Sequence, residues 1–399
     1  MLNPEVVSRC ALDAADGKIS RPEVVKFFKD FDKSYDYIIK CIKNPDYNPN
    51  EKNTHSIIDG AHHKQRVIEK PRFCPEQVLH HMIVYGFKPV VLNGLYEQIY
   101  GCLPQQVIKS ANVEDKLIIR KYGVHAAVHQ LTKWLQIKSK LYVCEADIHH
   151  AYPSVHIATL VRMLQEVIKD DDWLKLVYKF LHYNPDDPES ENVYGLVLGH
   201  YTSPWFFNFY LKKFDHYMAA MQDVKYLRFA DNIFLIGPNK RKVHRAKDAM
   251  IEYLRTNLRL ELNKSLQVFR FEWYDTKTEK VRGRAVNALG SVIHYNRVTA
   301  RKSTLQRMRR KANRINKKQA NNTVSWHDAA SMLARLPLVR HTNTYKYYEK
   351  NIKSKIKIPK LKQNIKDYTK ATKGKSLKER TIIHDGLAKS TKLNKADGV

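Results

Sequence analysis

The sequence predicts a mixed α/β (α+β) protein, and three observations support that class. Short β-prone runs lie at 141–155 and 225–237. Apolar residues recur at intervals of three and four over 243–258, which is typical of an amphipathic helix. The acidic, proline-containing stretch 184–192 has the composition of a surface loop. With 399 residues, of which 43% are apolar, the chain can bury a large core.

The first two hundred or so residues combine a strand-like piece with helices. Residues 64–84 begin as a basic, strand-like piece and continue as an apolar run with helical spacing. Residues 195–211 pass from a glycine-rich turn into a helix, for which we expect Ser203 as the N-cap and Pro204 as the first helical residue. We find no internal repeat.

The C-terminal quarter is helical in pattern and strongly basic. Residues 301–318 and 325–348 have helical spacing, whereas the last 30 residues or so lack the apolar side chains of a core. Of the net charge of +30, residues 301–399 carry 27 basic and six acidic side chains, a net charge of +21. Such a concentration of charge is typical of proteins that bind a polyphosphate backbone. Stacking surfaces for bases lie among these cations, at Tyr345, Tyr347 and Tyr348.

The composition argues against a membrane-embedded or secreted protein. No run of about 18 apolar residues occurs, and the start of the chain has neither the basic flank nor the apolar stretch of a signal peptide. We therefore expect a cytoplasmic location. The five cysteines are widely separated, so we expect reduced thiols rather than a zinc site or a disulfide framework. They are Cys10, Cys41, Cys74, Cys102 and Cys144.

Two carboxylates lie where predicted strands end. Asp147 ends the strand within 141–155, and Asp231 with Asn232 is expected at the tip of a hairpin over 225–237. Carboxylates from neighbouring strand ends can hold two magnesium ions about 3.5 to 4 Å apart, as phosphoryl transfer from a nucleotide requires. Taken alone, either aspartate is more often a cap or a turn residue.

Five segments occur in a fixed order along the chain. They are ADIHHAYPSV from 146, LGHYTSPWFFNFYL from 198, FADN from 229, LELNKSLQV from 260 and ALGSVIHY from 288. In order and spacing they resemble the four palm motifs and the primer grip of the reverse-transcriptase family, over roughly residues 55 to 350. The resemblance implies a right-hand polymerase fold with fingers, a palm made of an antiparallel sheet with helices, and a helical thumb.

The resemblance also divides the chain. We expect an N-terminal segment and fingers over 1–140, and a palm with the catalytic motifs over 141–296, with room for further finger elements in 160–195. A helical thumb is expected over 297–350 and a basic tail over 351–399.

By the same resemblance, Asp147 and Asp231 are metal ligands, and the carbonyl of Ile148 completes one metal shell. The third motif departs from the family's aromatic-x-Asp-Asp, because its last residue is Asn232. An amide oxygen can coordinate magnesium but brings no charge. Glu145 lies on the face of Asp147 by strand alternation and is an alternative source of that charge.

The resemblance assigns further residues to the incoming nucleotide. Tyr152 would place its ring under the sugar, where it clashes with a 2′-OH and favours DNA synthesis. Gly199 would allow close approach to the template, and Lys264 would protonate pyrophosphate. Four cations of the fingers alternate along a strand-like run and would share one face toward the triphosphate: these are Lys64, Arg66, Lys70 and Arg72. Paired histidines such as His149 and His150 diverge too far to chelate a metal.

Some departures bear on the subtype. Leu198 stands where the family often has Gln, and Ser203-Pro204 stands where diversity-generating reverse transcriptases usually have Ser-Gln. The thumb segments are similar to those of bacterial and phage reverse transcriptases related to that group.

The expected function is an RNA-directed DNA polymerase that uses Mg²⁺, or Mn²⁺, and deoxynucleotide triphosphates to copy an RNA template or dedicated non-coding RNA into DNA. It would act in antiphage (antiviral) defence or in sequence diversification, as a homo-oligomer or with a protein partner, without a membrane. The alternative is a catalytically weakened or silent RNA-binding subunit, in which Asn232 marks decay.

Overall fold

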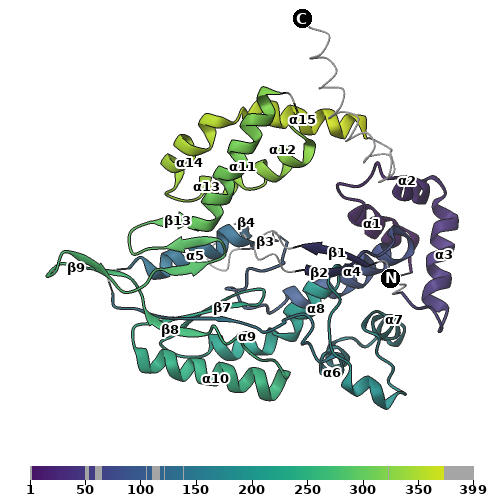
Figure 1. Ribbon diagram of the computed structural model, residues 1–399. Coiled ribbons are helices and arrows are strands. Elements are labelled where there is room, and N and C mark those ends of the chain that lie inside the picture. The colour runs from purple at the N-terminus through teal and green to yellow at the C-terminus, as the bar shows by residue number, and fades with distance from the viewer. Residues whose placement is uncertain are drawn as a thin grey trace, which may run out of the picture. The chain divides into compact units, whose positions relative to one another are not determined.

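Helices and strands are interleaved along the chain in the computed structural model (Figure 1). The structure describes residues 2–49, 54–58, 65–104, 106–109, 117–120, 122–137, 139–321 and 323–372. The chain divides into two compact units. The first comprises Met1–Ile19, Glu23–Ala127 and Leu141–Phe269, and the second comprises Ser20–Pro22, Val128–Lys140 and Arg270–Val399. The predicted mixed α/β class is confirmed.

A four-stranded sheet forms the centre of the first unit. Its strands follow the order β6 (Lys225–Phe229), β7 (Asn232–Gly237), β5 (Tyr142–Asp147) and β8 (Gln267–Arg270). Strand β7 is antiparallel to both of its neighbours. Five of its six residues are buried, as expected for a strand covered on both faces.

Helix α10 (Lys240–Leu258) packs against β5 and β7 through the apolar stripe that the sequence predicts. The buried members of this stripe are Val243, Ala246, Met250, Leu254 and Leu258. The helix begins where the Asn239 side chain accepts a hydrogen bond from the Arg241 amide, at 2.9 Å.

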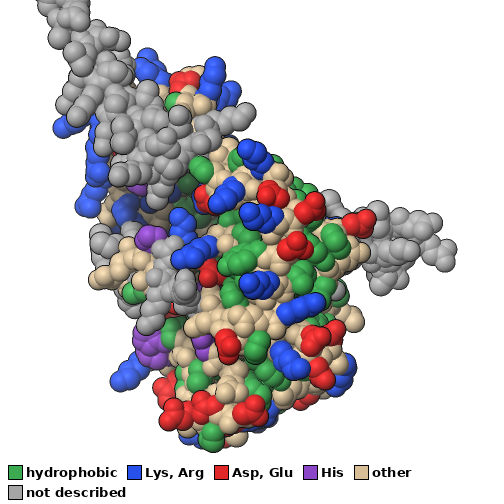
Figure 2. All heavy atoms as spheres, turned by 90° about the vertical axis from the view of Figure 1, so that its right-hand side faces the viewer, with side chains coloured by type: hydrophobic (Ala, Val, Ile, Leu, Met, Phe, Trp, Pro, Cys, Tyr) green, Lys and Arg blue, Asp and Glu red, His purple; other side chains and the backbone are tan. Residues whose placement is uncertain are grey.

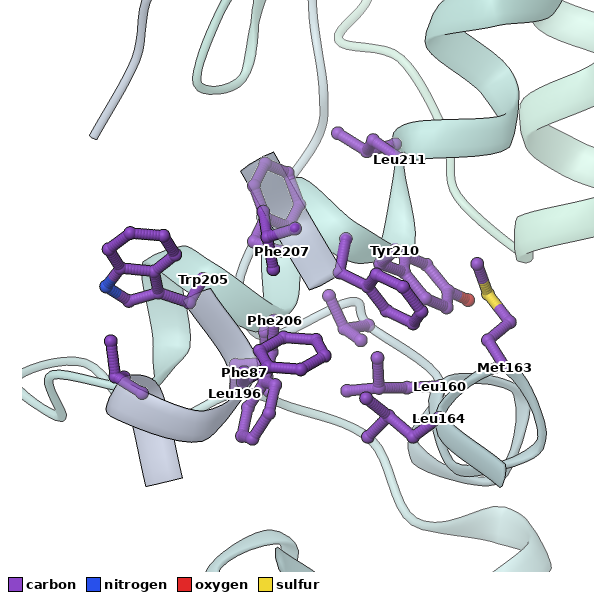
Figure 3. Close-up of a cluster of buried hydrophobic side chains, with 14 of the residues drawn as sticks. Phe87, Leu160, Met163, Leu164, Leu196, Trp205, Phe206, Phe207, Tyr210 and Leu211 are labelled. Carbon is purple, nitrogen blue, oxygen red and sulfur yellow. The ribbon is translucent and has the colours of Figure 1, made fainter. Parts of the chain in front are cut away.

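An aromatic helix, α8 (Ser203–Tyr210), fills much of the core. Figure 3 shows Phe206 beside Phe87 of α4 (Val78–Leu92), and the two ring centroids are 5.5 Å apart. The N-cap is Thr202, so the prediction of Ser203 was wrong by one residue. The Ser203 hydroxyl instead donates to the Val197 carbonyl, at 2.7 Å, and ties the preceding turn to the helix.

Further elements lie before residue 260, and of these most of α5 (Val124–Leu135) belongs to the second unit. They are α1 (Pro4–Ala14), α2 (Pro22–Lys29), α3 (Phe31–Lys43), β1 (Thr54–Ile58), β2 (Gln65–Glu69), a π-helical turn (Phe73–Gln77), β3 (Gln106–Lys109), β4 (Leu117–Arg120), α5 (Val124–Leu135), α6 (Ile157–Val167), α7 (Asp171–Leu181), a 3-10 turn (Pro188–Asn192) and α9 (Lys212–Ala219). Strands β1 and β2, and strands β3 and β4, form antiparallel hairpins.

The second unit pairs small sheets with a helical bundle. It contains β9 (Trp273–Asp275), β10 (Lys280–Arg282), β11 (Val286–Ala288), β12 (Ser291–Ile293), β13 (Val298–Ala300), α11 (Lys302–Ala320), α12 (Trp326–Leu333), α13 (Leu336–Arg340), α14 (Tyr345–Asn351), a 3-10 turn (Lys353–Lys355) and α15 (Ile358–Ala371). Within the described ranges of the whole chain, no helix is long and apolar enough to cross a membrane.

Two expectations for the C-terminal helices need correction. The stretch 325–348 is interrupted rather than continuous, since Pro337 enters the first turn of α13, where it cannot extend a preceding helix. Helical packing also continues past residue 350, because Leu361 of α15 is buried in the same apolar cluster as Tyr348. Tyr348 is therefore a core residue and not a stacking surface, whereas Tyr345 is exposed.

Buried histidines connect α4 to the start of α8. The ring of His80 is almost fully buried, with Nδ1 3.1 Å from Thr202 Oγ1 and its centroid 4.4 Å from that of His200. His200 Nε2 lies 3.2 Å from Glu69 Oε2 of β2. Burial, with His200 and His81 nearby, lowers the pKa of His80 well below 6.5.

This depressed pKa predicts acid sensitivity. Below about pH 6.5 His80 is protonated in the unfolded chain but stays neutral in the folded protein. Its contribution therefore lowers the free energy of unfolding by up to about 1.4 kcal/mol for each pH unit of acidification. We expect His80→Asn, which keeps a polar group near Thr202, to reduce the pH slope of stability below pH 6.5 by about one proton. Urea unfolding at stepped pH measures the slope. His129→Asn, at an exposed position of α5, is the control, and equal slopes in both variants would contradict the assignment.

Candidate active site

The two predicted aspartates come together at adjoining strand ends. Asp147 is the last residue of β5, and its Cα is paired with that of Asn232, the first residue of β7. The turn Ala230-Asp231 joins β6 to β7, and the Ile148 amide donates to the Asp231 carbonyl at 3.1 Å. The hairpin is therefore confirmed, with one correction: its tip is Ala230-Asp231, and Asn232 already belongs to β7.

The turn has a strained backbone and little space around it. Ala230 has φ +53°, in the left-handed region that costs a non-glycine residue about 1 kcal/mol or more. Behind it, a Cβ placed on Gly101 would lie 2.3 Å from the Ala230 nitrogen. Only glycine fits at position 101. Gly101 was not predicted as a functional residue, because a single glycine carries no signal in the sequence.

A buried arginine supports the turn between β6 and β7. Arg228 is fully buried, and its Nη1 donates to the Ala230 carbonyl at 2.9 Å. Its Nε and Nη2 donate to the two carboxylate oxygens of Asp215 on α9, at 2.7 and 2.6 Å. Tyr226 donates to the same carboxylate at 2.6 Å, and burial beside Asp215 raises the pKa of this tyrosine well above its usual value. The phenol therefore remains a hydrogen-bond donor.

Asn208 of α8 extends this network to Gly101. Its Oδ1 accepts a hydrogen bond from Arg228 Nη1 at 3.1 Å, and its Nδ2 donates to the Gly101 carbonyl at 3.1 Å. We call Asp215, Arg228, Tyr226 and Asn208 the turn-support network. None of its members was singled out from the sequence.

Each of the two predicted metal-binding carboxylates receives a hydrogen bond from an asparagine amide. Asn263 Nδ2 donates to Asp147 Oδ2 at 2.5 Å, and the Asn263 amide donates to the Asp147 carbonyl at 2.8 Å. Asn232 Nδ2 donates to Asp231 Oδ1 at 3.0 Å. Asn263 Oδ1 in turn lies 2.8 Å from His149 Nδ1. Asn263 belongs to the fourth motif, but its role could not be read from the sequence.

Tyr152 packs beside Phe207 of α8, and its predicted role at the nucleotide sugar stays a prediction. Its ring centroid is 5.1 Å from that of Phe207, and Cys102 is its neighbour on another side. Burial, together with Cys102 and the Asp231 charge, raises the pKa of Tyr152.

Lys264 and Gly199, which were predicted to contact the nucleotide or the template, lie in different surroundings. Lys264 is exposed and directly follows Asn263. Gly199 has φ +107°, and a Cβ there would lie 2.0 Å from the Glu69 carbonyl. The carbonyl of Glu69 in β2 is enough to require glycine here, and the close approach of a template stays a prediction.

The four cations of the fingers do not share one strand face. Lys64 and the side chain of Arg66 lie outside the described residues, so their predicted role stays a prediction. Strand β2 ends at Glu69, which makes the shared face wrong for Lys70 and Arg72. Pro71 cannot donate a ladder hydrogen bond, and both cations instead line a cavity beside α2 and α3.

The oxygen donors suit a divalent cation such as Mg²⁺. The carboxylates of Asp147 and Asp231, with the Ile148 carbonyl between two strand ends, are hard ligands of the kind that Mg²⁺ prefers. In the part of the chain that the structure describes, no three His, Cys, Asp or Glu side chains are grouped so as to hold a metal ion. His149 and His150 meet edge to face at 4.1 Å, in keeping with a structural role.

Comparison with known proteins identifies this region. Residues 108–293, which contain β5, β6, β7 and both aspartates, match the family model described as Reverse transcriptase (RNA-dependent DNA polymerase). The chain contains a reverse-transcriptase domain. The expected polymerase fold class, with mixed helices and sheets, is confirmed. No curated protein matches the chain.

Solved telomerases are among the similar structures. Apo telomerase from Candida tropicalis, truncated from its C-terminal domain, is 12% identical, with 67% of this chain and 59% of that chain covered and a TM-score of 0.38. Telomerase from Candida albicans in complex with a TWJ fragment of telomeric RNA is 12% identical, with 70% and 52% covered and a TM-score of 0.41. The chain therefore spans between about half and three fifths of those proteins.

The turn-support network of the reverse-transcriptase domain predicts a large stability effect. We expect Arg228→Met to destabilise the protein by about 3 to 5 kcal/mol, because the Asp215 carboxylate would remain buried without its partner. The double variant Arg228→Met/Asp215→Leu should recover much of this loss, since neither charge is then buried. Urea unfolding measures both.

The matched control is an ion pair on the surface. Lys213→Met breaks the exposed contact with Glu166 and should cost no more than about 1 kcal/mol. If Lys213→Met and Arg228→Met lower the free energy of unfolding by similar amounts, burial of the Arg228–Asp215 pair does not increase its effect on stability.

Proposed function

We propose that the chain is an RNA-directed DNA polymerase that makes cDNA from an associated RNA by two-metal-ion nucleotidyl transfer. The observation that supports the proposal is the pairing of Asp147, at the end of β5, with the turn that holds Asp231. Asp147, Asp231 and the Ile148 carbonyl would hold Mg²⁺ or Mn²⁺. When bound, such ions lower the barrier by stabilising charge on the attacking 3′ oxygen and the leaving pyrophosphate.

The protein's own residues position the reactants. Asn263 and Asn232 orient the two carboxylates through the hydrogen bonds described above. The ring of Tyr152, packed on Phe207, would exclude a 2′-OH from the sugar of the incoming nucleotide. Lys264 would donate a proton to pyrophosphate. The triphosphate contacts would come from Lys64 and Arg66.

A basic stripe on α11 supports binding of nucleic acid. Its exposed members follow intervals of three and four residues: Arg307, Arg310, Arg314 and Lys317. The buried Met308, Ala312 and Ile315 lie on the opposite face of the helix. Cations in one row along about 15 Å of helix suit a phosphate backbone.

The proposed setting is a bacterial or phage enzyme that acts in the cytoplasm with a dedicated non-coding RNA. Antiphage defence is favoured over sequence diversification by two departures from the diversity-generating pattern, Ser203-Pro204 and Asp231-Asn232. Asn232 also supports a second candidate, a silent RNA-binding subunit.

Catalysis separates these two candidates. We expect Asp147→Asn to lower primer extension by at least about a hundredfold, because one of two charged metal ligands is lost. Extension of a DNA primer on an RNA template, with Mg²⁺ or Mn²⁺, is the assay. Asp186→Asn, in the exposed loop before α8, is the control and should leave the rate unchanged. A wild-type chain that extends no primer on any template, beside an active Asn232→Asp variant, would support the silent subunit.

Sugar selection depends on the ring of Tyr152. We expect Tyr152→Ala to raise ribonucleotide use relative to deoxynucleotide use by at least about tenfold, because the group that clashes with the 2′-OH is removed. The ratio of kcat/KM for the two nucleotides measures this. Tyr152→Phe keeps the ring and should keep the selectivity. If both variants behave alike, the hydroxyl or the local packing sets the preference instead.

A further inference from the structure

A cavity of about 650 Å³ lies in the first unit, away from the catalytic turn in sequence. Helices α2 and α3 form one wall, and residues 70–77, which follow β2, form the other. The volume is in the range of sites that hold a nucleotide-sized ligand. Of its lining residues, Lys70 and Arg72 were assigned to the nucleotide from the sequence, but they do not lie on the strand face on which that assignment depended.

Cations dominate the rim of the cavity. Its charged lining consists of four cations, Lys26, Lys33, Lys70 and Arg72, and two carboxylates, Glu23 and Asp30. Among the residues that the structure describes, the three lysines have no ion-pair partner. Basic, acidic and apolar side chains are interspersed over this side of the molecule (Figure 2). Unpaired cations from three separate segments that converge on one hollow favour an anionic ligand.

Aromatic rings complete the cavity. Phe27 and Phe73 are buried, and their rings meet edge to face at 5.4 Å, forming an apolar floor. Tyr37 lies on the lining with about half of its surface exposed. Cations beside an accessible ring are the combination with which proteins hold single-stranded nucleic acid, through phosphate contacts and base stacking.

We propose that this cavity binds a segment of single-stranded RNA, with a phosphate among Lys26, Lys33 and Lys70 and a base against Tyr37. The inference rests on the proposed function, which requires an RNA partner, and adds where that RNA is held. Exposed lysines on two helices suit a continuous phosphate backbone. The wall also continues into β2, where the Glu69 amide donates to the Leu198 carbonyl of the second palm motif at 2.9 Å.

The test measures RNA binding by the full chain without any nucleotide addition. A fluorescent single-stranded RNA of about 12 nucleotides, within the usual span of such sites, is titrated over a range of KCl. We expect Lys26→Glu/Lys33→Glu to weaken binding at least about tenfold and to reduce the salt slope by about one for each lysine. The matched control, Lys29→Glu/Lys40→Glu, makes the same change of charge on positions of the same two helices outside the cavity. It should weaken binding less than about threefold.

Two further variants test stacking and folding. Tyr37→Leu should weaken binding, while Tyr37→Phe should not. If circular dichroism shows that the glutamate variant is unfolded, Lys26→Gln/Lys33→Gln replaces it, with the same expected direction. Equal losses in the cavity variant and its control would overturn the inference, and so would unchanged binding in the cavity variant.

The outcome for the proposed function is separate. Cavity-dependent RNA binding by a chain that extends no primer would retain this inference and reject the polymerase. If the chain extends a primer, and the cavity variants change neither extension nor RNA binding, the polymerase is retained and this inference is rejected.

Discussion

The ion pair between Arg228 and Asp215 fixes the catalytic turn. A buried ion pair is a weak source of net stability, because desolvation of both charges offsets their attraction. What this pair supplies is position. Asp215 holds one edge of the guanidinium through Nε and Nη2, so Nη1 is directed at the carbonyl of Ala230 and at Asn208. The left-handed Ala230 persists because these contacts determine its backbone more strongly than its own preference does.

Local patterns predicted the parts of the site that depend on neighbouring residues. Asp147 and Asp231 could be placed because a strand end and a hairpin turn are short-range features. The stripe of α10 was predictable for the same reason. The turn-support network was not, since Asn208 and Gly101 are 107 residues apart and their contact is created by the fold. A single asparagine or glycine forms no periodic pattern in the sequence, so the contact between Asn208 and Gly101 could not be predicted from it.

The basic run from Lys64 to Arg72 led to a wrong prediction, because the alternating pattern continues beyond the strand that it describes. Alternating cations from Lys64 to Arg72 suggested one strand, yet β2 ends at Glu69, which lies opposite Thr54 of β1. Beyond that register Pro71 redirects the chain, and its neighbours reach a different surface. Gly199 was recognised as a position of close approach, and in the structure the Glu69 carbonyl approaches it. Glu69 also contacts His200, and its amide donates to the Leu198 carbonyl, so the second motif is held against β2 at three consecutive residues.

The arrangement of the two asparagines gives Asn232 a physical meaning. Without metal, clustered carboxylates repel one another, and a second aspartate after Asp231 would add to that repulsion. The Asn232 amide removes one negative charge and supplies a donor to Asp231, as Asn263 does for Asp147. Each carboxylate is therefore oriented before a cation arrives. The cost is weaker attraction for that cation, because an amide adds no charge to the site. Compared with an aspartate at this position, Asn232 would attract a cation less strongly but holds the Asp231 carboxylate in a fixed orientation.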